Sequence, residues 1–256
     1  VREQSGWRQF NAGADQRVPV IQVDLSSVTE EEQLATIEVV ANEQQASFDL
    51  RQGPLLRVVL FELGAQQPAR LLVIFHHLVI DGVSWRILFQ DLPAIYEQLE
   101  GGEQPVLARK STSYKQWAES LMAYAQSESL KRESAFWTAD ARQAVKRLPL
   151  DHAAGVNDAA AARVIAVSLT AEETRALLKE VPGIYHTQIN DVLLAAVAKG
   201  VSAWTGETSC LVELEGHGRE EIIEGLDLSR TVGWFTSVYP VLLQVDENDD
   251  EGATLK

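Results

Sequence analysis

The fold is decided by residues 75–85, which read FHHLVIDGVSW. Residues 70–75 before them (RLLVIF) are mostly apolar and partly β-branched, which is typical of a buried strand. After them, Ile87, Leu88 and Leu92 fall at helical spacing. The pattern therefore predicts that the two histidines and Asp81 lie on the turn from a core strand to a helix.

Adjacent side chains at a strand end point to opposite faces, so one histidine can face a cavity while the other packs inward. An imidazole titrates near neutrality and exchanges a proton at either nitrogen, which suits acid–base chemistry. The structural alternative is that backbone groups satisfy both rings and that Asp81-Gly82 is an ordinary turn. A metal site is not favoured, because the chain has no HExxH motif and no paired cysteines, and His76 and His77 cannot share one ligand face.

Composition is that of a globular protein, with 46% hydrophobic and 23% charged residues among 256. No apolar run approaches the ~20 residues of a membrane helix, and no signal peptide opens the chain. The net charge of −15 argues against nucleic acid or an anionic membrane as a partner. A single cysteine, Cys210, excludes an intramolecular disulfide, so we expect a reducing, cytoplasmic location.

Two α/β units are predicted, at residues 1–150 and 163–256, joined by an alanine-rich linker at 151–162. In the first unit, a capping box at Thr29 and Glu32 predicts a helix. Its buried stripe is expected to consist of Leu34, Ile37, Val40 and Ala41.

Elsewhere the pattern predicts strands at 21–25, 58–60, 164–169, 211–214 and 241–245. Helices are predicted from Ser113, from a second capping box at Thr170, and over 192–204. The acidic run at 246–251 is expected to be a solvated loop. Four aromatic residues are interpreted as packing rather than as a ligand platform: Tyr114, Trp117, Phe136 and Trp137.

A second cluster of ionisable residues follows the predicted strand at 211–214, in the sequence EGHGRE at 215–220. The glycines allow positive φ and leave room beside the side chains. The structural alternative here is a surface turn on which Glu215 and Arg219 form a salt bridge and His217 is exposed.

Several strings resemble one family. HHxxxDG followed by Ser84 and Trp85 resembles the active-site motif of the condensation-type domains of nonribosomal peptide synthetases, and residues 48–57 (FDLRQGPLLR) resemble the same superfamily. DGVSW, EGHGRE and residues 230–241 (RTVGWFTSVYPV) look like the epimerization branch, and residues 185–196 (YHTQINDVLLAA) resemble the segment between them. The match follows the family's order over residues 1–245.

The resemblance implies an α/β (α+β) fold, in which two chloramphenicol-acetyltransferase-like lobes meet in a V with a tunnel between them. Family members are longer at both ends. We therefore expect an incomplete second lobe here, without the family's opening strand and helix.

The implied reaction inverts Cα of an aminoacyl or peptidyl thioester. By motif, His77 and Glu215 are the two catalytic groups. Asp81 is expected to brace the loop, with a partner in the missing N-terminal part, and Gly82 to keep space open beside His77. The full set of implied supporting residues is His76, Asp81, Gly82, Ser84, Trp85, His217 and Arg219.

No cofactor is expected to be bound by this domain, because the substrate would be carried on the phosphopantetheine of a neighbouring carrier domain in the same polypeptide. The domain is expected to be monomeric. Two alternatives remain: a condensation domain that uses His77 to position or deprotonate an amine, and a catalytically silent docking module. The presence of His77, Asp81 and Glu215 together argues against the second.

Overall fold

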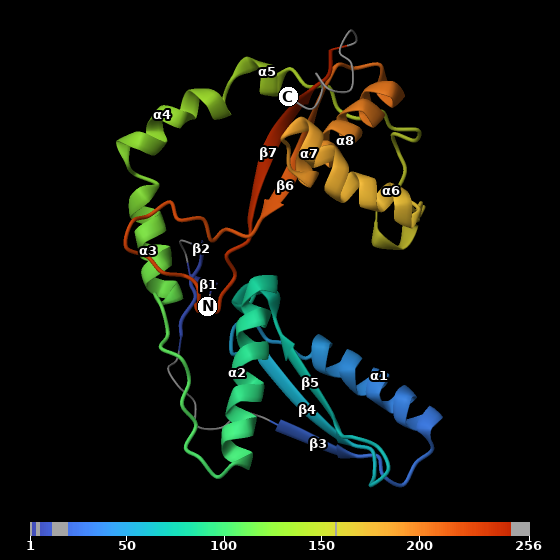
Figure 1. Cartoon of the computed structure of the whole chain (residues 1–256), viewed down its shortest axis with the longest axis vertical. Coiled ribbons are helices and arrows are strands. Elements are labelled where there is room, and N and C mark those ends of the chain that lie inside the picture. The colour runs from blue at the N-terminus through green and yellow to red at the C-terminus, as the bar shows by residue number, and fades with distance from the viewer. Residues whose placement is uncertain (1, 4–5, 12–19, 157, 247–256) are drawn as a thin grey trace. The chain divides into compact units, whose positions relative to one another are not determined.

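The computed structural model describes residues 2–3, 6–11, 20–156 and 158–246, and Figure 1 shows the course of the chain. The chain forms two compact units. Unit 1 contains Val1–Leu121 and His217–Thr236, and unit 2 contains Met122–Gly216 and Ser237–Lys256.

These units differ from the predicted division at 1–150, 151–162 and 163–256. Residues 122–150 belong to unit 2, and the loop 217–236 belongs to unit 1 although it connects two strands of unit 2. The physical reason is that this loop hydrogen-bonds to residues early in the chain. One example is the bond from the Thr112 amide to the Asp227 carbonyl, at 2.8 Å.

Unit 1 is built on a three-stranded sheet in the order β3–β4–β5. Its strands are β3 (Val20–Asp24), β4 (Leu56–Glu62) and β5 (Arg70–Phe75). The central strand β4 runs parallel to β3 and antiparallel to β5. Helix α1 (Glu30–Ala46) connects the two parallel strands and lies beside the sheet (Figure 1), as a crossover between parallel strands requires.

The N-terminus of α1 has the predicted capping box, in which the Thr29 and Glu32 side chains each accept the other residue's backbone N–H. The predicted buried stripe is wrong at Leu34, which is 50% exposed. Gln33 is the buried residue of this helix, because its side-chain amide donates to the carbonyls of Leu25 and Leu63. A polar side chain with buried partners thus occupies a position that hydrophobicity alone does not predict.

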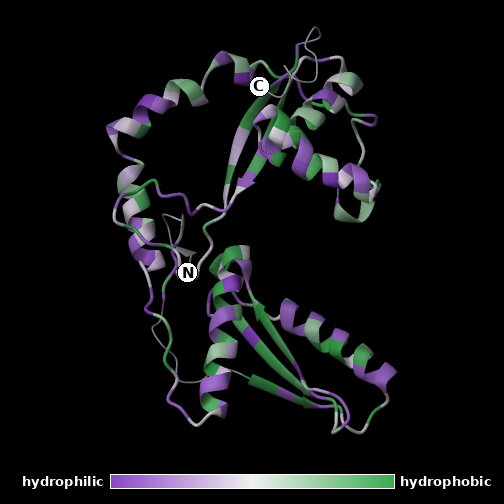
Figure 2. Ribbon diagram, in the orientation of Figure 1, coloured by the Kyte–Doolittle hydropathy of each residue, from purple (hydrophilic) through white to green (hydrophobic). Residues whose placement is uncertain are grey.

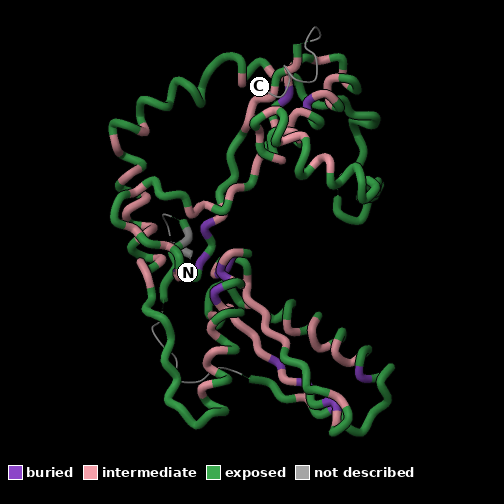
Figure 3. The backbone as a smooth tube through the Cα atoms, viewed as in Figure 1, coloured by how far each residue is buried: buried purple, intermediate pink, exposed green. Residues whose placement is uncertain are grey.

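The core of unit 1 lies where β4 meets α1. Its most buried residues are Leu25, Val59, Phe61 and Leu63, with Val23, Ile37, Val40 and Leu72 packed against them. Figure 2 shows the corresponding hydrophobic runs of β4 and β5, and Figure 3 shows buried positions on β4, at the start of α2 and on the 217–236 loop.

The remaining elements of unit 1 include helix α2, which follows β5 after one short turn. They are β1 (Arg2–Glu3), β2 (Gly6–Trp7), the 3-10 turn η1 (His77–Val79), α2 (Gly82–Glu100) and the start of α3 (Tyr114–Tyr124). The predicted break at Gly101-Gly102 is confirmed, since Gly101 caps α2.

Unit 2 pairs two antiparallel strands, β6 (Ser209–Gly216) and β7 (Ser237–Gln244), which helix α8 (Ile189–Thr205) contacts. Its other elements are α4 (Glu128–Trp137), α5 (Asp140–Gln143), η2 (Ala159–Ala161), α6 (Ala171–Arg175), the π-helical turn η3 (Ala176–Glu180) and α7 (Val181–Tyr185). Cys210 is buried here, and burial raises the pKa of its thiol.

Two predictions about unit 2 are wrong. Residues 164–169 form no strand; Val164 and Ile165 are more than 90% exposed, because no strand within the described residues pairs with them. Phe136 is 60% exposed and stacks beneath the Arg142 guanidinium instead of packing in a core. The second capping box, at Thr170 and Glu173, is confirmed.

Most of the predicted acidic loop at 246–251 lies outside the described residues. Across the described ranges, no helix combines the length and apolar character needed to cross a membrane.

Candidate active site

His76 has a structural role at the turn after β5. Its Nδ1 accepts the backbone N–H of Leu78 at 3.2 Å, which caps the short turn η1. Its ring also meets the Phe48 ring edge-on, with centroids 5.8 Å apart. A ring with one nitrogen occupied by its own backbone is poorly placed to exchange protons with a ligand.

His77 is exposed and projects differently from its neighbour. Its ring contacts Trp234 at a centroid separation of 5.8 Å and an interplanar angle of 67°. The prediction that one histidine packs and the other stays open is therefore confirmed, with His77 as the open one.

Asp81 is the buried anchor of this turn, with 3% of its side chain exposed. As the N-cap of α2, its Oδ1 accepts the backbone N–H of Ser84 at 2.7 Å. Its Oδ2 accepts the backbone N–H of Phe235 at 3.2 Å. One carboxylate thus ties the start of α2 to the 217–236 loop.

The charge partner of Asp81 is Arg219. The Arg219 Nη2 donates to both carboxylate oxygens at 3.1 Å and to Ser84 Oγ at 2.9 Å. Its Nη1 donates to the carbonyls of Leu228 and Thr231, each at 2.9 Å. The guanidinium lies over the Phe235 ring, 3.9 Å from its centroid.

This pairing corrects two expectations. The partner of Asp81 lies in the EGHGRE loop, not in an N-terminal part outside the chain. The surface salt bridge between Glu215 and Arg219 does not form, because the Arg219 guanidinium is turned toward Asp81 and is 8% exposed.

The network sets the protonation states around it. Burial disfavours the charged form of Asp81, but hydrogen bonds from Ser84, Arg219 and Phe235 outweigh that effect and lower its pKa below the ordinary 3.8. Burial, and then the negative charge of Asp81, raise the pKa of Tyr114 above its usual value. Tyr114 therefore remains a hydrogen-bond donor at neutral pH.

Ser84 is fully buried and ties α2 to the other end of the same loop. Its Oγ donates to the Gly233 carbonyl at 3.0 Å and accepts the Gly233 N–H at 3.1 Å. A Cβ on Gly233 would lie 2.2 Å from the Tyr114 ring, so only glycine fits there.

Gly218 is the second glycine that the site requires. It has φ of +67°, and an added Cβ would lie 1.7 Å from the Phe235 carbonyl oxygen. This close approach brings the EGHGRE segment against the segment around Phe235.

The other predicted residues lie at the edges of this network. Glu215 is exposed near the end of β6, where it pairs with Val238, and it belongs to unit 2. His217 is also exposed, and its Nδ1 accepts the Arg219 N–H at 3.0 Å. Gly82 begins α2 with open space at its Cβ position. Trp85 packs edge-on against Phe75, outside the hydrogen-bonded network.

Sequence reasoning missed two contributors to this site, Tyr114 and Trp234. The Tyr114 hydroxyl donates to the Trp234 carbonyl at 2.8 Å. Trp234 lay inside the RTVGWFTSVYPV string, so the string signalled its region but not its contact with His77.

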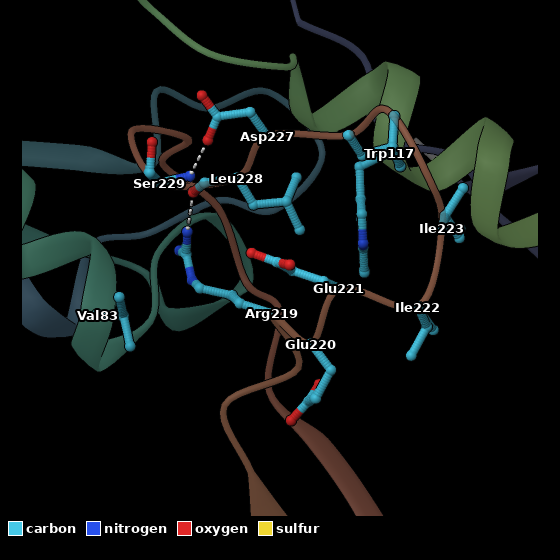
Figure 4. Close-up of a pocket in the computed structure, with 11 residues that line it drawn as sticks. Val83, Trp117, Arg219, Glu220, Glu221, Ile222, Ile223, Asp227, Leu228 and Ser229 are labelled. Carbon is cyan, nitrogen blue, oxygen red and sulfur yellow. Dashed lines mark hydrogen bonds between the residues drawn. The ribbon is translucent and has the colours of Figure 1, made fainter.

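A cavity of about 340 Å³ adjoins the network within unit 1. Figure 4 shows Arg219 bonded to the Leu228 carbonyl on one side of it and Trp117 of α3 on the other. The loop residues 220–229 form most of the remaining wall. Among the described residues, no group of three or more His, Cys, Asp or Glu side chains is arranged to hold a metal ion.

Comparisons with known proteins agree with this geometry. The profile of the Condensation domain family matches residues 1–256. The chain is 52% identical to one of the linear gramicidin synthase proteins of Brevibacillus parabrevis, over all of this chain and 3% of that protein. It is 44% identical to surfactin synthase subunit 1 of Bacillus subtilis (strain 168), over 97% of this chain and 7% of that protein.

Among solved structures, the epimerization domain from the third module of tyrocidine synthetase B matches with a TM-score of 0.80 and 37% identity, covering 92% of this chain and 53% of that one. The first condensation domain of the calcium-dependent antibiotic synthetase shares the fold, with a TM-score of 0.68 and 20% identity over all of this chain and 58% of that one. This chain thus spans a small part of the curated relatives and about half of the solved domains. With the α/β fold confirmed, the chain belongs to the condensation domain family, the superfamily of nonribosomal peptide synthetase domains that its motifs resemble.

Proposed function

We propose that this chain is part of an epimerization domain, which converts the L configuration at Cα of a carrier-bound aminoacyl or peptidyl thioester to D. The observation that carries the proposal is the 37% identity to an epimerization domain, against 20% to a condensation domain of the same fold. EGHGRE and RTVGWFTSVYPV, the strings that resemble the epimerization branch, support it.

Inversion at Cα needs three things from the protein. A base removes the α-proton, which the thioester carbonyl acidifies; the enolate oxygen is stabilised; and a proton is returned to the opposite face of Cα. The C–H bond is broken and remade with no change in oxidation state, so the reaction requires no redox partner. General acid–base groups typically contribute about 10²–10⁴-fold to such proton transfers.

His77 and Glu215 are proposed as the two proton-transfer groups. Both side chains are exposed, and each lies where a strand ends: His77 after β5 and Glu215 near the end of β6. Neither is used in the buried network that holds the surrounding loops. Exposed groups on anchored turns can meet a substrate without first breaking structural contacts.

The remaining predicted residues are assigned to support. Asp81, Ser84 and Arg219 hold the two loops together, and Gly82 leaves open space at the start of α2. His76 and His217 cap their own turns, while Trp85 packs beside β5. The substrate would be delivered on the phosphopantetheine of a carrier domain in the same polypeptide, and no cofactor of the domain itself takes part.

The test is an exchange experiment in heavy water. The full-length protein, supplied with an L-aminoacyl or L-peptidyl thioester on its carrier domain, should replace the Cα hydrogen by deuterium and yield a mixture of D and L products. Chiral chromatography and mass spectrometry of the released amino acid measure both. Amide formation without exchange would show a condensation domain, and binding without either reaction would show a docking module.

A further inference from the structure

We infer that Trp234 is a positioning residue that orients the imidazole of His77. The inference rests on the proposed function for its catalytic consequence, but the contact itself is a property of unit 1. Trp234 was not among the residues that the motifs single out, and its placement follows from how the segment around it is held.

The backbone around Trp234 is anchored at every step by a side chain from elsewhere in unit 1. Ser84 binds both the N–H and the carbonyl of Gly233. The Tyr114 hydroxyl donates to the carbonyl of Trp234 itself, and Asp81 accepts the N–H of Phe235. Three consecutive residues are therefore fixed by partners 120 to 154 positions away in sequence.

These anchors are themselves buried. Ser84 and Asp81 are 0% and 3% exposed, and burial strengthens hydrogen bonds whose partners cannot exchange with water. Gly233 is confined by the Tyr114 ring on its other side. The Cα of Trp234 is thus a fixed point from which its indole projects.

The indole is not required for the packing of this segment. Phe235, the next residue, fills the interior: it is 2% exposed and its ring contacts both Tyr114 and Trp117. Trp234 remains 39% exposed. A large aromatic side chain that is rigidly mounted but half outside the core has a role other than core formation.

What the indole contacts is His77, at 5.8 Å and 67°, the edge-to-face geometry that aromatic rings prefer. Within the described residues, the His77 imidazole has no hydrogen bond or ion pair of its own. Its orientation is therefore set by the χ preferences of the turn and by this ring contact. Restricting the imidazole to one orientation spares the entropy of ordering it at the moment of proton transfer.

The decisive variants are Trp234→Leu, which keeps bulk but removes the aromatic face, and Trp234→Phe, which keeps an aromatic face. We expect Trp234→Leu to lower kcat for Cα exchange about 10- to 100-fold in the full-length protein, with KM for the loaded carrier changed little. Trp234→Phe should recover most of the loss. Trp204→Leu is the matched control, because Trp204 is 61% exposed on α8 in unit 2; it should leave kcat unchanged.

A second readout does not depend on the reaction. The imidazole C2 hydrogen of a histidine exchanges slowly with heavy water, and peptide mass spectrometry measures its rate. In Trp234→Leu the peptide containing His77 should exchange at least about twofold faster, since one face of the ring is uncovered. The peptides containing His152 and His186 serve as internal references, and thermal unfolding confirms that each variant folds.

The outcomes separate the two proposals. If the wild type exchanges Cα hydrogen and Trp234→Leu does so equally fast, the positioning role is wrong while the proposed function stands. If the wild type shows no Cα exchange, the proposed function fails, and the His77 exchange rate still decides whether Trp234 orients the ring. Unchanged His77 exchange in Trp234→Leu overturns the inference in either case.

Discussion

The loop after β5 and the loop after β6 carry the same kinds of residues but use them in complementary ways. The first holds two imidazoles and a carboxylate, His76, His77 and Asp81. The second holds a carboxylate, an imidazole and a guanidinium, Glu215, His217 and Arg219. In each loop one ionisable group is buried, Asp81 and Arg219, and these two bind each other.

The difference lies in what each loop leaves exposed. The first loop presents an imidazole, His77, and the second presents a carboxylate, Glu215, and the imidazole of His217. The buried members therefore build the site and the exposed members are free for chemistry. Charge alone would not separate the two groups; burial and hydrogen bonding do.

The largest expected effect tests the exposed members. His77→Ala and Glu215→Gln should each lower Cα exchange by about 10²–10⁴-fold in the full-length protein, because each removes a proton-transfer group. Thermal unfolding should be unchanged, since neither side chain belongs to the buried network. The double variant should be little slower than either single one, as groups acting in one step are not additive.

His217→Ala is the control for that pair and should lose less activity, because His217 only accepts the amide of Arg219. Near-normal exchange in Glu215→Gln together with its abolition in His217→Ala would mean that the wrong exposed residue of the second loop has been chosen.

The buried members should respond in the opposite way. Arg219→Gln leaves the Asp81 carboxylate buried without its counter-charge, and breaking such a pair typically costs about 3–5 kcal/mol in the free energy of unfolding. Urea denaturation measures it. Arg230→Gln is the matched control: its partner Asp91 and Arg230 itself keep about a quarter of their side-chain surface exposed, so water can replace the lost contact and the cost should be below about 1 kcal/mol. Equal losses in the two variants would remove the distinction between buried and exposed pairs.

The contact between the two loops can be tested at Gly218. Gly218→Ala introduces both a positive-φ alanine and a collision with the Phe235 carbonyl. Gly225→Ala shares the positive φ, at +82°, but meets nothing within 4 Å. We expect Gly225→Ala to cost roughly 1–2 kcal/mol from conformation alone, and Gly218→Ala to cost about 1–3 kcal/mol more from the clash. Denaturant midpoints of the two variants give the comparison, and indistinguishable midpoints would contradict the close approach.

The smallest expected effect is a dependence on pH. The pKa of Asp81 is lower in the folded protein than its ordinary 3.8. Its contribution to stability is therefore complete above the unfolded-state pKa of about 3.9 and is lost as pH falls through the lower folded value. The stability difference between wild type and Asp81→Asn, measured by urea denaturation, should be constant from pH 7 to 5 and shrink below pH 4. A difference that grows on acidification would reverse the sign assigned to this group.

Local chemistry predicted much of unit 1 correctly from the sequence. The strand at 70–75, the break at Gly101 and the two capping boxes depend on neighbouring residues, and all are present. The division of labour between His76 and His77 also followed from local geometry, because adjacent side chains at a strand end diverge.

Long-range partners could not be predicted in this way. Asp81 and Arg219 are 138 residues apart, and no periodicity links them. Their complementary charges, each beside a glycine in a separate motif, were the only signal available. The failed strand at 164–169 has the same origin, since an apolar alternating segment becomes a strand only where another strand pairs with it. The catalytic pairing of His77 with Glu215 stays a prediction.

The sequence separation of Asp81 and Arg219 has a consequence for how the protein is made. At about 5–20 residues per second, a ribosome needs roughly 7–28 s after synthesising Asp81 before it adds Arg219. Throughout that interval the carboxylate lacks its counter-charge, and all of residues 122–216 must be produced before unit 1 can be completed. The nascent chain thus carries an unfinished first unit while the second is being translated, and the EGHGRE segment is the piece that closes it.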